Sequence, residues 1–99
     1  PYGGGTTTME ALWQGVPVVS LDGDRWASRT SVSLLRAAGL DPFVASSPAD
    51  YVVRCIAFAH SPELLGPLRA GLRGGLRHSP VCDAAAFARA MEQLYAQLL

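Results

Sequence analysis

The segment best suited to chemistry lies at the start of the chain, where small and polar residues follow one another: Gly3, Gly4, Gly5, Thr6, Thr7, Thr8 and Glu10. Threonine is a good N-cap, and apolar residues recur at helical spacing from Met9 to Trp13, so we predict a helix from about Thr7 to Gln14. The first turn of a helix offers unpaired N–H groups and partial positive charge. Glycines before it allow close approach, so this segment could bind a diphosphate.

Two interpretations of this segment remain open from the residues alone. Phosphate binding and plain capping of a helix by threonine fit equally well. The segment is not a P-loop, because it lacks the Lys-Ser/Thr pair, and it is not a dinucleotide fingerprint, because it lacks GxGxxG. If a nucleotide binds, Glu10 is placed to accept hydrogen bonds from ribose hydroxyls, since it follows Thr6 by one turn.

The rest of the chain alternates helical patterns with short apolar runs. We predict strands and further helices at these positions: strands Val16–Leu21 and Pro42–Ala45, and helices from about Ala27 to Ala38, Pro48 to His60, Pro62 through Leu76, and Cys82 to Leu98. This order predicts an α/β fold with a parallel sheet and a helical C-terminal cap. Two strands cannot complete such a sheet, so we expect Val16–Leu21 to be a buried strand that pairs with chain preceding Pro1.

Several side chains are expected in the core. Trp13 lies on the apolar face of the first helix, and two later helices have apolar stripes: Tyr51, Val52, Cys55, Ile56 and Ala59 in one, and Phe87, Met91, Leu94, Tyr95 and Leu98 in the other. Only 16% of residues are charged, against 49% hydrophobic. We therefore expect some apolar surface to be covered by chain beyond these 99 residues.

Composition excludes several classes of partner. The net charge is zero and no basic field exists, so nucleic acid and anionic membranes are not expected partners. No apolar run approaches the ~20 residues that span a bilayer, and the opening loop without a signal peptide predicts a piece of a longer protein. Cys55 and Cys82 lack the spacing of a zinc site, so we expect no metal and two buried thiols in a reducing cytoplasm.

Other polar residues have a functional and a structural interpretation each. Asp22 and Asp24 could approach a sugar, but a turn is the simpler role, and Trp26 could stack on a ligand, but packing at a domain junction is favoured. Arg29 could approach phosphate, but an ion pair with Asp22, Asp24 or Glu10 is favoured.

The remaining candidates lie in the later helices. An arginine stripe is favoured as a solvated face over a site for an anionic partner: Arg69, Arg73 and Arg77. His60 and His78 lie near helix ends, where contact with the helix dipole explains them better than catalysis. No residue is a convincing catalytic base, so we assign no catalytic residue.

Residues 4–21 resemble the bacterial, tetratricopeptide-associated branch of the O-linked N-acetylglucosamine transferase family. The similarity continues collinearly through Ala27-Ser28-Arg29, Ala38-Gly39-Leu40, Ser79-Pro80 and Glu92-Gln93-Leu94-Tyr95. The resemblance implies that residues 1–99 are the C-terminal portion of the second Rossmann-like domain of a GT-B fold. It also implies inverting transfer of a sugar, N-acetylglucosamine in this family, from UDP to a protein Ser or Thr without a metal.

The resemblance implies roles for individual residues. Thr6 and Thr7 match threonines that contact the diphosphate, and Glu10 matches an acidic residue at the ribose. The candidate donor-binding residues are thus Gly4, Gly5, Thr6, Thr7, Thr8 and Glu10. Expected partners are the UDP-sugar, a protein acceptor and the N-terminal remainder of the enzyme. A non-catalytic interaction module or remnant domain, or a GT-B enzyme with another sugar or acceptor, remains the alternative.

Overall fold

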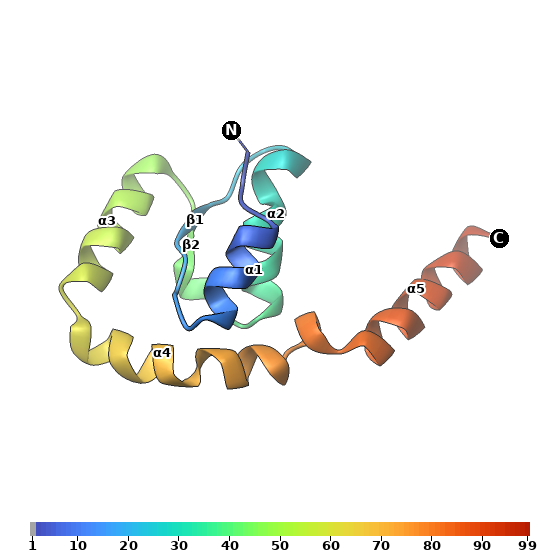
Figure 1. The fold of residues 1–99 in the computed structure, drawn as a ribbon. Helices are drawn as coiled ribbons and strands as arrows, with labels where there is room; N and C mark the ends of the chain where they lie inside the picture. Colours follow the sequence, from blue (N-terminus) through green and yellow to red (C-terminus); the bar gives the residue numbers. More distant parts are fainter. Residues whose placement is uncertain (1) are drawn as a thin grey trace.

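The computed structural model describes residues 2–99 as five α-helices, two short strands and two 3-10 turns (Figure 1). In chain order these are α1 Thr6–Trp13, β1 Ser20–Leu21, α2 Trp26–Ala37, η1 Asp41–Phe43, β2 Val44–Ala45, α3 Pro48–Ala59, α4 Pro62–Arg77, η2 Pro80–Cys82 and α5 Ala84–Leu98. The five predicted helices are all present, and their ends agree with the prediction within about two residues. None of the helices described between residues 2 and 99 is long and apolar enough to cross a membrane.

The two strands are parallel and α2 connects them, which is the β-α-β unit that an α/β fold requires. Ser20 pairs with Val44, and Leu21 pairs with Ala45. The predicted α/β class with a parallel sheet and closing helices is therefore confirmed. Both α1 and α2 begin on the same side of the molecule, at the top of the view in Figure 1.

The first strand is shorter in the described chain than predicted, and its expected burial against chain preceding Pro1 stays a prediction. Residues 16–19 are extended but form no ladder among the described residues, and Val16 is 44% exposed. Pro17 has no N–H to donate, and β2 is only two residues long because Pro42 and Phe43 form a 3-10 turn instead of a strand. Without a longer partner, an apolar run cannot extend a sheet.

The core lies where α1, α2, η1 and α4 meet. Its buried side chains come from all four elements: Leu12, Leu35, Phe43, Leu72 and Leu76. Phe58 of α3 stacks on Phe43, with ring centroids 4.3 Å apart. Trp13, which was expected in this core, is instead 39% exposed at the end of α1.

The apolar stripes predicted for α3 and α5 are largely exposed in the described chain, and the expected cover by further chain stays a prediction. On α3, Ile56 is 53% exposed, because Phe58 provides the packing face. Helix α5 extends away from the body of the molecule (Figure 1), and Phe87 and Leu98 are 65% and 82% exposed. Helical periodicity identifies an apolar face, but it does not say whether another element covers that face.

The arginines of α4 are solvent-exposed, as predicted, and two of them also bind the end of α1. Arg69 Nε donates to the carbonyl oxygen of Gly15 at 2.9 Å, and Arg73 makes a similar bond to Trp13. Since the last carbonyls of a helix lack partners within it, these guanidinium groups satisfy the C-terminal end of α1. The expected dipole role of His78 is supported, because its Nδ1 lies 2.8 Å from the carbonyl oxygen of Gly74.

Candidate functional site

The N-terminus of α1 is not capped by any side chain. Gly5 is the N-cap residue, and the N–H of Met9 makes the first helical bond, to the Gly5 carbonyl oxygen at 3.1 Å. The N–H groups of Thr6, Thr7 and Thr8 thus have no partner within the helix. The interpretation of the threonines as simple caps was therefore wrong. The first turn of α1 also contains no acidic side chain, which would repel a bound anion.

Helical geometry divides the candidate residues between two faces. Thr6, Thr7 and Glu10 are exposed and lie on one face of α1. Within residues 2–99 no hydrogen bond occupies the hydroxyls of Thr6 and Thr7. Thr8 lies on the opposite face with Leu12, where it is 4% exposed. The structure therefore brings Thr6, Thr7 and Glu10 together at the surface.

The Thr8 hydroxyl faces inward and does not join this exposed group, although Thr8 is among the predicted donor-binding residues. Its Oγ1 lies 2.8 Å from the Oγ of Ser31 on α2. The only part of Thr8 that remains a candidate for ligand contact is its backbone N–H. Sequence reasoning missed Ser31, because nothing in its local pattern distinguishes a buried serine from an exposed one.

The glycines before α1 differ in how much space surrounds them for a side chain. A Cβ at Gly4 would lie 2.6 Å from the Oγ1 of Thr8, so this position has no space for a side chain. A Cβ at Gly5 would meet only the methyl group of Thr30, at an ordinary 3.6 Å. The N–H of Gly3 donates to the carbonyl oxygen of Ala27 at 2.8 Å, which ties the loop to the start of α2.

A hollow of about 480 Å³ lies between the first turns of α1 and α2. It is lined by residues of both helices and of the loop before α1: Gly5, Thr6, Met9, Trp26, Arg29, Thr30, Ser33 and Leu34. Trp26 is 84% exposed among the described residues, and its expected packing at a domain junction stays a prediction. Arg29 connects the hollow to Asp22, which directly follows the carboxyl end of β1, and crevices at this end of an open α/β sheet commonly bind ligands.

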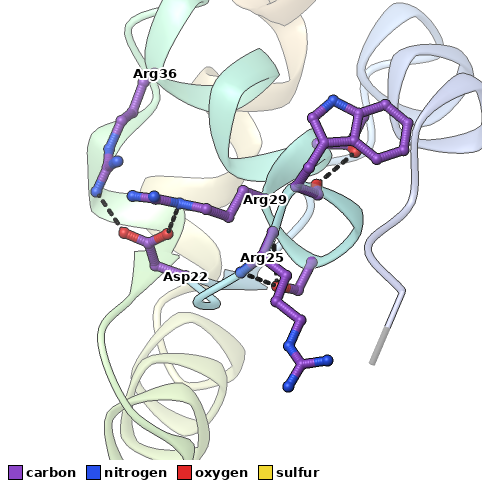
Figure 2. Close-up of polar contacts among 7 residues, drawn as sticks. Asp22, Arg25, Arg29 and Arg36 are labelled. Carbon is purple, nitrogen blue, oxygen red and sulfur yellow. Dashed lines mark hydrogen bonds and ion pairs between the residues drawn. The ribbon is translucent and has the colours of Figure 1, made fainter.

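Arg29 is one of the residues that line this hollow. Figure 2 shows its side chain in an ion-pair cluster with Asp22 and Arg36. Its Nε lies 3.1 Å from Oδ1 of Asp22, while a terminal nitrogen of Arg36 lies 3.1 Å from Oδ2 of the same carboxylate. The predicted pairing of Arg29 with Asp22 is confirmed. Arg36 was not predicted, although it follows Arg29 by two helical turns and so lies on the same face of α2.

Arg25 and Asp24 remain in solvent nearby, with 3.6 Å between their charged groups. Of the two thiols predicted to be buried, Cys55 is half-buried and Cys82 is exposed, and both are free. Among residues 2–99, no group of three or more His, Cys, Asp and Glu side chains is arranged to hold a metal ion.

The fold and this helix-terminus site agree with the class of protein that the sequence resembles. Residues 2–91 match the model of glycosyl transferase family 41. The chain therefore belongs to glycosyl transferase family 41, which confirms the predicted resemblance.

The chain is also similar in sequence to individual proteins of plants and animals. The chain is 42% identical over 95 residues to the probable UDP-N-acetylglucosamine–peptide N-acetylglucosaminyltransferase SPINDLY of Solanum lycopersicum, a match covering 96% of this chain and 10% of the relative. It is 30% identical to UDP-N-acetylglucosamine–peptide N-acetylglucosaminyltransferase of Caenorhabditis elegans, covering 96% of this chain and 8% of that protein.

A solved structure of a mutant O-GlcNAc transferase from Thermobaculum terrenum superposes with a TM-score of 0.85 and 38% sequence identity. That match covers 98% of this chain and 19% of the solved one. The chain thus spans about a tenth of the length of the relatives it matches in sequence, and about a fifth of the solved chain.

Proposed function

We propose that a polypeptide containing this chain transfers N-acetylglucosamine from UDP to serine or threonine hydroxyls of proteins. In this proposal, residues 1–99 are part of its UDP-sugar-binding domain and bind the diphosphate and ribose of the donor. Family membership and the names of the relatives support the reaction class. A cytoplasmic location, the bacterial branch and accompanying tetratricopeptide repeats stay predictions; the free thiols of Cys55 and Cys82 fit the first of them.

One observation carries the proposed site: Thr6 and Thr7 are exposed at a helix N-terminus that no side chain caps. Their hydroxyls and backbone N–H groups are hydrogen-bond donors without partners among residues 2–99, and the helix dipole adds partial positive charge there. A diphosphate needs several donors and a positive potential at one place. The backbone of Gly4 and Gly5 beside them allows the phosphates to approach closely.

Glu10 completes the proposed site on the ribose side. It lies on the same exposed face of α1 as Thr6 and Thr7, about one turn further along. A carboxylate accepts hydrogen bonds and cannot bind phosphate, so its position behind the donors suits vicinal hydroxyls of a ribose. The order along α1 would then follow the order of groups in a nucleoside diphosphate.

Such a site would also assist the chemical step. In sugar transfer, the bond between the anomeric carbon and the diphosphate oxygen breaks while the acceptor hydroxyl oxygen bonds to that carbon. Negative charge grows on the departing diphosphate, and fixed donors aimed at it stabilise the transition state more than the ground state. Thr6 and Thr7 provide such donors without a metal.

The test is UDP affinity of the full-length polypeptide, measured by calorimetry for Thr7→Val and Glu10→Gln. Val keeps the shape of Thr and removes its hydroxyl, and we expect each variant to raise the Kd for UDP about ten-fold, the equivalent of roughly 1.5 kcal/mol. Thr7→Ser, which restores a hydroxyl, should bind nearly as well as the parent protein.

Glu63→Gln is the matched control for Glu10, because Glu63 is exposed in the first turn of another helix, α4. It should leave the affinity unchanged. Parent-like affinity in both Thr7→Val and Glu10→Gln would refute this site even if the protein binds UDP elsewhere.

A further inference from the structure

A buried serine joins the proposed site to the neighbouring helix. Ser31 of α2 is 2% exposed. Its hydroxyl donates to the carbonyl oxygen of Gly4 and lies 2.8 Å from the Oγ1 of Thr8. A serine hydroxyl has one proton, and here the carbonyl takes it because a carbonyl can only accept. The Thr8 hydroxyl must then donate to Ser31, so a directed chain runs from Thr8 through Ser31 to Gly4.

The two ends of this chain lie on either side of the point where α1 begins. Gly4 precedes the N-cap residue Gly5, whereas Thr8 is the third residue of the helix. Ser31 therefore holds the last loop carbonyl and the first helical turn in one relative arrangement. Between them lie Thr6 and Thr7, the two residues whose donors face solvent.

We propose that Ser31 is a positioning residue for binding of a nucleoside diphosphate, an inference that rests on the proposed function. Ser31 does not touch the ligand; it fixes the direction of the N–H groups and hydroxyls of Thr6 and Thr7. Three consecutive glycines before the helix have wide conformational freedom, and binding must otherwise order them. A loop held in its binding arrangement in advance loses less entropy when the ligand arrives.

A purely structural role for Ser31 makes a different prediction, and Ser79 provides the control that separates the two. Ser79 is also buried, at 9% exposure, in the turn after α4. Its hydroxyl donates to the carbonyl oxygen of Leu76 at 2.7 Å and accepts from the N–H of Val81 at 3.3 Å. Ser79→Ala thus removes a similarly bonded hydroxyl at a place outside the proposed site.

The experiment compares Kd for UDP in the full-length polypeptide, by calorimetry well below the melting temperature. We expect Ser31→Ala to raise the Kd about three- to ten-fold, the effect of one neutral hydrogen bond, and Ser79→Ala to change it less than about two-fold although both lower the melting temperature. Thr8→Val breaks the same chain at its donor end and should reproduce Ser31→Ala, whereas Thr8→Ser should bind like the parent protein.

The double variant Ser31→Ala/Thr8→Val tests whether the two residues act through one chain. If they do, its Kd equals that of either single variant; independent ligand contacts would instead multiply the two effects, which would overturn the proposal. A parent-like Kd in Ser31→Ala would also overturn the proposal. If Ser31→Ala does not fold, a parent-like Kd in Thr8→Val would overturn it instead.

A parent protein that binds no UDP at millimolar concentration would refute the proposed function itself and this inference with it. Tight binding by the parent protein with equal affinity in Ser31→Ala would refute only the role of Ser31.

Discussion

Arg73 of α4 holds the last turn of α1 through two contacts with one residue, Trp13. Its Nε donates to the Trp13 carbonyl oxygen at 2.6 Å, and its Cζ lies 5.1 Å from the centroid of the indole ring. The residues are sixty positions apart in sequence, so this contact fixes α4 against α1. It also explains why a tryptophan can lie at the surface, because the guanidinium covers one face of the ring.

Arg73→Ala should lower the free energy of unfolding by about 1–2 kcal/mol, since it removes a charged hydrogen bond and an exposed cation–π contact. Chemical denaturation followed by circular dichroism measures this change. Arg77→Ala is the control, because Arg77 is exposed near the C-terminal end of α4 and makes no side-chain hydrogen bond within residues 2–99. Because alanine favours a helix at least as well as arginine, helix propensity cannot cause the loss, and equal destabilisation by both variants would mean that the contact with α1 does not set the cost.

The α4–α1 contact marks the limit of what the sequence could predict. Helical period predicted α3, and its first turn is capped by the adjacent Ser47, whose Oγ accepts from the N–H of Asp50 at 3.0 Å. Such signals are local, so they could be read from neighbouring residues. The partners of Arg69 and Arg73 lie more than fifty residues away, and spacing along α4 contains no information about them.

The candidate site shows the same division between local and distant information. The position of Thr6, Thr7 and Glu10 on one face of α1 follows from 3.6 residues per turn and was predicted correctly. That Thr8 faces inward depends on Ser31, which only the fold brings close. The length of the strand at Val16–Leu21 likewise depends on distant partners, and β2 pairs with only its last two residues.

Gly15 and Gly39 each follow the C-terminal end of a helix and both have a left-handed backbone conformation. Substituting each by alanine measures the cost of a side chain there. Their φ angles are +78° and +74°, but a Cβ at Gly15 would lie 3.0 Å from the Arg69 carbonyl oxygen, while a Cβ at Gly39 meets nothing within 4 Å. Gly39→Ala should destabilise the protein by about 1 kcal/mol, the cost of the backbone alone. Gly15→Ala should cost roughly 1 kcal/mol more, because α4 must also shift.

Thermal unfolding of both variants measures this difference in stability. For Gly74→Ala, by contrast, we expect an increase in stability. Gly74 lies within α4, and a Cβ there meets nothing within 4 Å. Alanine should therefore stabilise the helix by up to about 1 kcal/mol. A Gly15→Ala variant no less stable than Gly39→Ala would show that the close approach of Arg69 is relieved without cost.

Asp50 should make stability depend on acid pH. The backbone N–H of Ser46, followed by the guanidinium of Arg54, holds the pKa of the Asp50 carboxyl below its ordinary value of 3.8. A group with a lowered pKa in the folded state stabilises the fold above its unfolded pKa, and this contribution disappears as pH falls through the folded pKa. The loss should thus occur below about pH 4.

The measurement compares the melting temperatures of the parent protein and Asp50→Asn from about pH 6 to about pH 2. Asn keeps an acceptor for the Ser46 N–H but has no charge, so the variant should melt lower at pH 6 and the gap should close toward pH 2. A gap that stays constant across this range would show that ionisation of Asp50 does not contribute.

Asp22 lies directly after the carboxyl end of β1, where crevices of open α/β sheets commonly bind ligands, so its role can be structural or functional. The carboxylate is 22% exposed and bonds Arg29 and Arg36 together, whereas the neighbouring Asp24–Arg25 pair is solvent-exposed on both sides. Asp22→Ala should therefore lower stability by about 1 kcal/mol at low salt and less at high salt, and Asp24→Ala should have no measurable effect.

Donor kinetics then separate the two roles of Asp22. Its loss would free Arg29 beside the hollow at Thr6, and a freed cation there would favour an anionic ligand. With a structural role, the KM for the UDP-sugar should stay constant or fall slightly in Asp22→Ala, in spite of the lower melting temperature. A KM that rises several-fold at unchanged stability would instead indicate that Asp22 contacts the sugar, because only a lost ligand contact weakens binding without weakening the fold.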